Sequence, residues 1–172
     1  MKVSFPYGKE YLSLDIPESR LQGVLVSNLH HYEPKAAPLE LVEEALKNPI
    51  GSAPLCELAK GKKNVVLIAS DHTRPVPSRD ILPPMLEQLR QGNPDIAVTL
   101  LVATGFHRPT TTLELEAKLG AEIAEKETIV VHDAFDPDSN VQIGILPSGA
   151  PLVIDRAAVE TDLLISEGFI EP

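Results

Sequence analysis

Residues 64–78, "NVVLIASDHTRPVPS", decide the fold of this chain. They begin with an apolar run rich in β-branched side chains, and such a run is typical of a strand covered on both faces. The polar residues that follow predict a loop, and helical spacing then appears at Ile81, Met85 and Leu89. Strand, loop and helix in this order form the repeating unit of a parallel α/β sheet.

The same unit recurs further along the chain. Residues 96–104, "IAVTLLVAT", predict a strand, "GFHRPT" a loop, and "TTLELEAKLG" a helix. Thr111 and Glu114 have the spacing of a capping box, and Gly120 offers a helix stop. Further strands are predicted at "TIVVH" (128–132), "VQIGIL" (141–146), "PLVID" (151–155) and "DLLIS" (162–166).

The N-terminal part has a different pattern. The segments "KVSF" (2–5) and "YLSLDI" (11–16) alternate around a turn and predict short antiparallel strands. Helices are predicted at "PLELVEEALKNPIG" (38–51), "APLCELAKGKK" (53–63) and "RDILPPMLEQLRQG" (79–92). Because Pro83 and Pro84 oppose helix, the last one is expected to start late with Asp80 as its cap, or to be kinked.

Together these elements predict the fold class. We expect one α/β domain over residues 1–172, with three layers and a mainly parallel sheet that carries helices on both faces, as in Rossmann-like folds. The short antiparallel strands lie at the N-terminus of this domain. The pattern does not define the order of the strands.

The composition limits the partners and the cellular location that we expect for this chain. Acidic residues number 25 against 15 basic ones, for a net charge of −10, which opposes non-specific binding to nucleic acid. The single cysteine, Cys56, cannot form an internal disulfide. The N-terminus lacks the apolar stretch of a signal peptide, and no run approaches the roughly 20 apolar residues of a membrane span. We therefore expect a cytoplasmic protein with neither nucleic acid nor membrane as partner.

Polar residues gather where the predicted strands end. Ligands of parallel α/β sheets bind outside the carboxyl ends of the strands, so these residues are candidates for a site. Three of the five histidines are among them. The residues at the strand ends are Ser70, Asp71, His72, Thr73 and Arg74; Thr104, Gly105, Phe106, His107 and Arg108; His132 and Asp133; and Ser166, Glu167 and Gly168.

Arg74 and Arg108 point to an anionic ligand. A guanidinium can bind a carboxylate or phosphate through two parallel hydrogen bonds, and both loops lead into helix N-termini, which also favour anions. Each residue also has a structural interpretation. A strand-end histidine can simply bond a backbone carbonyl, Arg108 can be a solvated loop charge, and Asp71 can cap its own turn.

Several common chemistries lack support. His132 beside Asp133 supplies only two ligands, so we favour a surface pair and predict no metal site. The chain has no G-x-G-x-x-G after a strand, no Walker A loop, no G-x-S-x-G elbow and no H-E-x-x-H.

Four motifs resemble a known family. They are "ASDHTRPVPS" (69–78), "LVATGFHRPT" (101–110), "LPSG" (146–149) and "DLLISEGFIEP" (162–172), and "NPIGS" (48–52) extends the likeness over essentially the whole chain. Taken in this order, the four motifs resemble the N-terminal domain of the nickel-pincer-nucleotide lactate racemase family. The resemblance implies a racemase or epimerase of 2-hydroxy acids, in which a hydride passes from the substrate to the cofactor and returns to the opposite face.

The resemblance also implies roles for individual residues. His107 would be an acid/base residue that takes the hydroxyl proton, and Asp71, His72, Thr73 and Arg74 would contact the cofactor, a nickel pyridinium-3,5-bisthiocarboxylic acid mononucleotide. Arg74 would also hold the substrate carboxylate and count among the catalytic residues. Arg108, the second arginine of the predicted edge, is a further candidate for the substrate.

The family pattern continues beyond Pro172. The resemblance implies that a second catalytic histidine, a lysine that anchors the cofactor and a nickel-ligating histidine lie in that continuation. We therefore expect an excised N-terminal domain that is inactive and free of nickel on its own, with the C-terminal domain of the same polypeptide as its partner. The alternatives are a non-catalytic module that binds a nucleotide or small carboxylate, and a structural or interaction domain.

Overall fold

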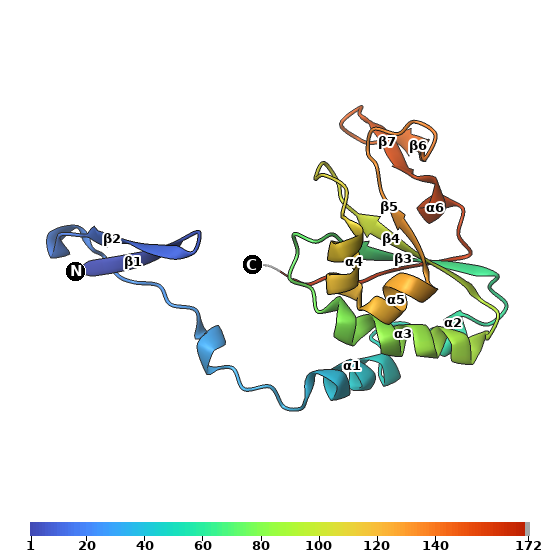
Figure 1. Cartoon of the computed structure of the whole chain (residues 1–172), viewed down its shortest axis with the longest axis horizontal. Helices are drawn as coiled ribbons and strands as arrows, with labels where there is room; N and C mark the ends of the chain where they lie inside the picture. Colours follow the sequence, from blue (N-terminus) through green and yellow to red (C-terminus); the bar gives the residue numbers. More distant parts are fainter. Residues whose placement is uncertain (171–172) are drawn as a thin grey trace. The chain divides into compact units, whose positions relative to one another are not determined.

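The computed structural model describes residues 1–170 and divides into two compact units, residues 1–35 and the part from residue 36 onward. The smaller unit is a hairpin of β1 (Lys2–Tyr7) and β2 (Glu10–Asp15), followed by the short turns Glu18–Arg20 and Asn28–His31 (Figure 1). The strands are antiparallel and pair Lys2 with Asp15. The prediction of short antiparallel N-terminal strands is confirmed.

A four-stranded parallel sheet forms the centre of the larger unit. Its order is β5-β4-β3-β8, and the strands are β3 (Asn64–Ser70), β4 (Ala97–Ala103), β5 (Thr128–Val131) and β8 (Leu163–Ser166). β3 pairs with β4 in register along its whole length, from Asn64 opposite Ala97 to Ser70 opposite Ala103. The two loops that follow these strands therefore start side by side at one edge.

The core lies between one face of this sheet and most of the helices. Val65 and Leu67 of β3 and Leu100 of β4 are fully buried there. The helices are α1 (Pro38–Lys47), α2 (Leu55–Leu58), α3 (Ser78–Gly92), α4 (Thr112–Leu119), α5 (Ala121–Lys126) and α6 (Arg156–Val159). Each fully buried leucine or valine contributes about 1.5–3 kcal/mol relative to an exposed one, so the aliphatic side chains supply most of the stability.

The connections explain how the helices divide between the two faces. α3 joins β3 to β4, and α4 and α5 join β4 to β5, so three helices return along the same face. The chain then crosses back from β5 to β8, and a right-handed connection in that direction places α6 on the opposite face. The predicted parallel α/β class, with its flanking helices, is confirmed.

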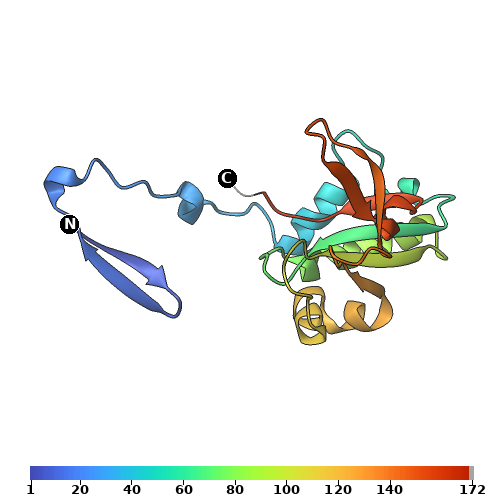
Figure 2. The same ribbon diagram turned by 90° about the horizontal axis from the view of Figure 1, so that it is seen from above.

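The segment between β5 and β8 also contains an antiparallel hairpin of its own. β6 (Asn140–Ile145) pairs with β7 (Pro151–Asp155) apart from the central sheet. Figures 1 and 2 show this hairpin projecting from the larger unit. The face of the sheet opposite the main core is less covered, since Leu164 of β8 remains 48% exposed.

The predicted late start of α3 is wrong. The helix begins at Ser78, directly after Pro77, and continues through Pro83 and Pro84. Ser78 is fully buried, and its hydroxyl donates to Glu167 Oε1 at 2.6 Å, which ties the first turn to the end of β8. Burial of Leu82, Met85, Leu86 and Leu89 against the sheet offsets the backbone hydrogen bonds that the prolines cannot make.

The predicted caps of α4 are confirmed. Thr111 and Glu114 form a complete capping box, and Gly120 ends the helix with φ of 92°. No helix among residues 1–170 is long and apolar enough to span a bilayer. The cytoplasmic location stays a prediction.

Gly92 provides a test of this packing. Gly92 lies at the end of α3, where the backbone of α2 packs closely against it. A Cβ added at this position would lie 2.0 Å from the Cys56 carbonyl oxygen. We predict that Gly92→Ala lowers the free energy of unfolding by about 1–3 kcal/mol, because the backbone of Cys56 would have to move to make room for the added methyl group. Urea unfolding measures this. Gly144→Ala is the matched control, because an added Cβ there meets nothing within 4 Å. A Gly92→Ala protein as stable as the control would contradict the packing.

Candidate functional site

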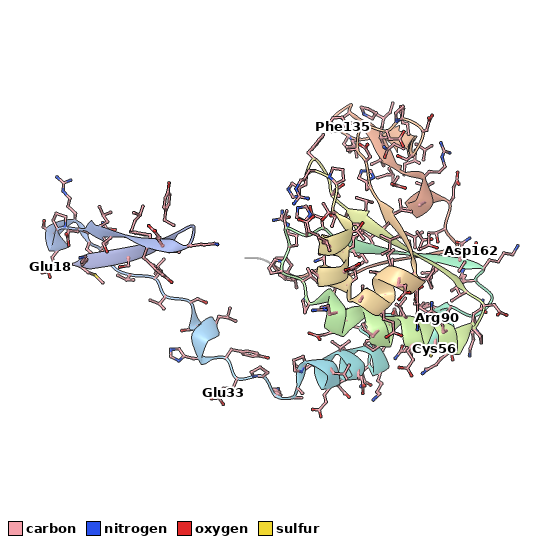
Figure 3. The ribbon with its side chains drawn as sticks, viewed as in Figure 1. Glu18, Glu33, Cys56, Arg90, Phe135 and Asp162 are labelled. Carbon is pink, nitrogen blue, oxygen red and sulfur yellow. The ribbon has the colours of Figure 1, made fainter. Side chains whose placement is uncertain are left out.

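The polar residues predicted at the strand ends do meet at one edge of the sheet. The loops after β3 and β4 face each other there, as their in-register parallel pairing requires. Phe135, on the loop after β5, lies near the carboxyl ends of the strands in Figure 3, and Asp162, just before β8, lies near their amino ends. The candidate site lies at the carboxyl ends. The prediction that these two loops lie together is confirmed.

The central interaction of the edge joins Asp71 to His107. The ring nitrogen Nδ1 of His107 lies 2.6 Å from Asp71 Oδ2. The other oxygen, Oδ1, accepts the Thr73 hydroxyl at 2.6 Å and the Thr73 backbone N–H at 3.0 Å. Asp71 is 1% exposed, whereas the His107 side chain is 45% exposed. A buried carboxylate thus holds a solvent-accessible imidazole.

The pKa of Asp71 lies below its ordinary value. Burial by itself raises this pKa, but the hydrogen bonds from Thr73 and His107 favour the ionised form and together outweigh the burial. An ionised Asp71 can only accept, so Nδ1–H of His107 donates the hydrogen bond between them. In a neutral imidazole Nε2 is then the nitrogen with a free lone pair, so this pair can perform general acid/base chemistry.

A cleft of about 420 Å³ opens beside the pair. It is lined by His107 and Asp71 and by Arg74, which is exposed. The remaining lining residues are Ile68, Ser70, Ala103, Thr104, Gly105, Phe106 and Glu167. The structure therefore brings an acid/base candidate and a cation to one cavity, as predicted for His107 and Arg74.

Arg108 points to a different partner. Its guanidinium binds the carboxylate of Glu114 through both nitrogens, with one contact at 2.8 Å. The pKa of Glu114 is held well below its ordinary value, first by this arginine and then by the Thr111 backbone N–H. Arg108 thus joins the His107 loop to the cap of α4, and it is not among the residues that line the cleft.

His72 adjoins the pair, since its Nδ1 lies 4.0 Å from Asp71 Oδ2, but its hydrogen-bond partner is another residue. Its Nδ1 lies 3.1 Å from the Thr110 hydroxyl. It lines a second cavity of about 420 Å³ together with Arg74, Arg79 and Lys118. Of the predicted cofactor-contacting segment, Asp71 and Arg74 border the cleft of His107, and His72 borders the neighbouring cavity.

Glu167 and Lys118 are the residues whose importance sequence reasoning missed. Glu167 was noted only for its position after β8, and its pKa is raised by burial against the opposing effects of Ser78 and Lys118. Burial lowers the pKa of Lys118, and its ammonium donates to the Arg74 carbonyl at 3.0 Å. Nothing in the pattern of α4 distinguishes this lysine from a solvated one.

Two buried oxygens at the cleft lack hydrogen-bond partners. They are Ser70 Oγ and Glu167 Oε2, on neighbouring strand ends, since the Glu167 N–H donates to the Ile68 carbonyl at 2.9 Å. Buried polar atoms are nearly always paired, so unpaired ones in a cavity wall are suited to a polar ligand. A ligand with hydroxyl groups could satisfy both.

His132 has a different partner from the one expected. The predicted surface pair with Asp133 is wrong, because His132 Nδ1 lies 2.9 Å from Asp155 Oδ2 and Asp133 instead accepts the Phe135 N–H. The hairpin of β6 and β7 brings Asp155 back to the end of β5, which no local pattern indicates. Within residues 1–170 no group of three or more His, Cys, Asp or Glu side chains could hold a metal ion.

The fold defines a parallel α/β domain, and the candidate residues lie at the carboxyl ends of its strands, where ligands of this class of fold bind. A sequence comparison makes the assignment more specific. The profile of the lactate racemase N-terminal domain matches residues 7–172, and the chain therefore belongs to this family. The resemblance predicted from the four motifs is confirmed.

Individual relatives agree with this assignment. The lactate racemase of Thermoanaerobacterium thermosaccharolyticum is 49% identical over 170 residues, and that of Lactiplantibacillus plantarum is 50% identical over 169 residues. These matches cover 99% and 98% of this chain, but 40% of each relative. The chain thus spans about two fifths of the length of these enzymes.

Solved structures show the same fold. The lactate racemase apoprotein from T. thermosaccharolyticum matches with a TM-score of 0.87 over 100% of this chain and 40% of that one, at 49% identity. A protein from Thermotoga maritima matches with a TM-score of 0.60 over 74% of this chain and 32% of that one. The second match, at 21% identity, bears on the fold alone.

The titration of Asp71 tests the central pair. In the wild-type chain we predict an Asp71 pKa below that of an ordinary aspartate, and in His107→Ala a higher one, because a hydrogen bond to the ionised form is lost. The ionised Asp71 therefore stabilises the fold at pH values above the usual aspartate pKa, and this contribution to the free energy of unfolding is lost as pH falls through the lowered pKa. Carboxyl ¹³C shifts against pH measure this. An unchanged Asp71 midpoint in His107→Ala would show that the contact is not made in solution.

Proposed function

We propose that this chain is the N-terminal catalytic part of a lactate-type racemase or epimerase that acts on 2-hydroxy acids. The observation that carries the proposal is the Asp71–His107 pair beside Arg74 in one cleft. The names of the two relatives support lactate as the substrate class. The same polypeptide would supply a C-terminal domain, since the relatives extend well beyond the matched region.

Arg74 and His107 suit the two functional groups of such a substrate. The Arg74 guanidinium would bind the carboxylate and orient the adjacent carbon, and its planar fork favours one orientation. Nε2 of His107 would then take the proton of the hydroxyl on that carbon and return it later. Asp71 would stabilise the imidazolium that forms, because it is ionised and already bound to Nδ1.

Arg108 has a supporting role in this scheme. Its pairing with Glu114 holds the loop that contains His107 against α4. We therefore assign the carboxylate contact to Arg74 and propose that Arg108 acts through its pairing with Glu114, by holding the His107 loop in place.

The residues described here fit the organic part of a nickel-pincer nucleotide better than its metal. The unpaired Ser70 Oγ and Glu167 Oε2 suit ribose hydroxyls, and Asp71 and Arg74 line the same cleft. Nickel ligands would come from elsewhere, as no suitable cluster exists within residues 1–170. When bound, the cofactor would supply the acceptor for the hydride of the substrate carbon.

A chimeric enzyme tests His107. This chain would replace the matched region of the Thermoanaerobacterium lactate racemase, and lactate racemisation would be measured with nickel content and melting temperature. We predict that His107→Ala lowers the racemisation rate by roughly 10²–10⁴-fold while nickel content stays normal, because only the proton transfer is removed. Lys126→Ala, a surface change on α5, is the control. Near-normal turnover of His107→Ala in an active chimera would exclude the catalytic role.

The two arginines make a second, paired test in the same chimera. We predict that Arg74→Ala raises KM for lactate at least about tenfold and also lowers kcat, because the carboxylate loses a charge-assisted, two-point contact. Arg108→Ala should change KM less, since its guanidinium is already bound to Glu114. Steady-state kinetics measure both. A larger KM effect at Arg108 than at Arg74 would reverse the assignment.

A further inference from the structure

A second histidine–aspartate pair lies outside the cleft. His132 Nδ1 is 2.9 Å from Asp155 Oδ2, and Asp155 is 6% exposed. The other oxygen of Asp155 accepts the Ala157 N–H at 2.9 Å and so caps α6. Asp155 is therefore held from both sides, and the imidazole is fixed to the junction of β7 and α6.

The backbone of His132 extends this contact to the loop after β4. Its carbonyl accepts the hydroxyl of Thr104, which is 3% exposed, and its N–H donates to the Val102 carbonyl at 3.1 Å. The Thr104 carbonyl in turn accepts the N–H of His107 at 2.9 Å. An unbroken series of contacts thus runs from Asp155 through His132 and Thr104 to His107.

Aromatic packing joins the same two loops a second time. The rings of Phe106 and Phe135 lie with centroids 5.6 Å apart. Both side chains are largely exposed, so burial elsewhere does not hold them in place. Residues 105–109 and 132–135 together line a cavity of about 320 Å³, which shares Gly105, Phe106 and His107 with the cleft of Arg74 and Glu167. The His107 loop is therefore supported by the chain after β5.

We infer that His132 and Asp155 form a positioning pair, which fixes the Thr104–His107 turn and thereby aims the His107 ring at Asp71. The contact series stands on geometry alone, while the catalytic meaning of His107 rests on the proposed function. Positioning matters because a displacement of about 1 Å at a reacting group can cost roughly 100-fold in rate. His132 itself does not line the cleft.

The inference is tested on the 172-residue chain, without substrate or cofactor. In His132→Leu we expect the amide hydrogen of His107 to exchange about fivefold faster or more, as loss of one hydrogen bond of roughly 1 kcal/mol implies. The Asp71 carboxyl should titrate at higher pH, because His107 is held less firmly. His132→Asn, whose amide N–H can replace Nδ1, should restore both properties.

Thr104→Val is the second variant, and it removes only the hydroxyl that donates to His132. It should reproduce the changes at His107 and Asp71, and it provides the test if His132→Leu does not fold. Arg156→Ala is the matched control: Arg156 adjoins Asp155 and bonds Glu160, but it lies outside the contact series. Its His107 exchange and Asp71 titration should equal those of the wild type.

The outcomes separate positioning from general stabilisation. Changes at His107 and Asp71 in His132→Leu and Thr104→Val, with rescue by asparagine, support the inference. A lower melting temperature with unchanged His107 exchange and Asp71 titration overturns it, as does an equal effect of Arg156→Ala. Because no readout involves racemisation, these results do not depend on whether the proposed function is correct.

Discussion

The buried carboxylate of Asp71 is the constraint on which the rest of the site depends. It follows β3 directly and is almost fully enclosed, so it needs partners for both oxygens. Thr73 supplies partners from the same loop, and His107 supplies one from the loop after β4. The hydrogen bonds to this one buried carboxylate thereby join the two loops. They also leave Nε2 as the ring nitrogen of His107 that does not contact Asp71.

The charges around this carboxylate differ from the acidic balance of the whole chain. The net charge is −10, yet Arg74 and Lys118 lie at the same edge, with Asp71 and Glu167 as nearby counter-charges. Lys118 is held by the Arg74 carbonyl and acts at short range on Glu167. The local field at the cleft is thus set by a few side chains and their burial, and the overall charge has little influence there.

The edge is also supported from outside the central sheet. The hairpin of β6 and β7 contributes Asp155, which binds His132 and so reaches the turn before His107. Insertion of this hairpin between β5 and β8 lets the chain support the His107 loop through residues that do not line the cleft. The lactate racemase apoprotein from T. thermosaccharolyticum, of which this chain covers 40%, has a similar overall fold, with a TM-score of 0.87.

The sequence by itself determined the parallel α/β class, the capping box of α4 and the edge where Asp71, Arg74 and His107 meet, because these follow from local periodicity and from the geometry of parallel strands. It could not reveal the pairing of Arg108 with Glu114, nor the start of α3 at Ser78, which depends on Glu167, 89 residues away. Only the tertiary structure decided that His132 binds Asp155 and that Ser70 and Glu167 leave unpaired oxygens at the cleft. The physical reason is that side-chain hydrogen bonds between distant segments depend on how layers pack, and packing leaves no period in the sequence.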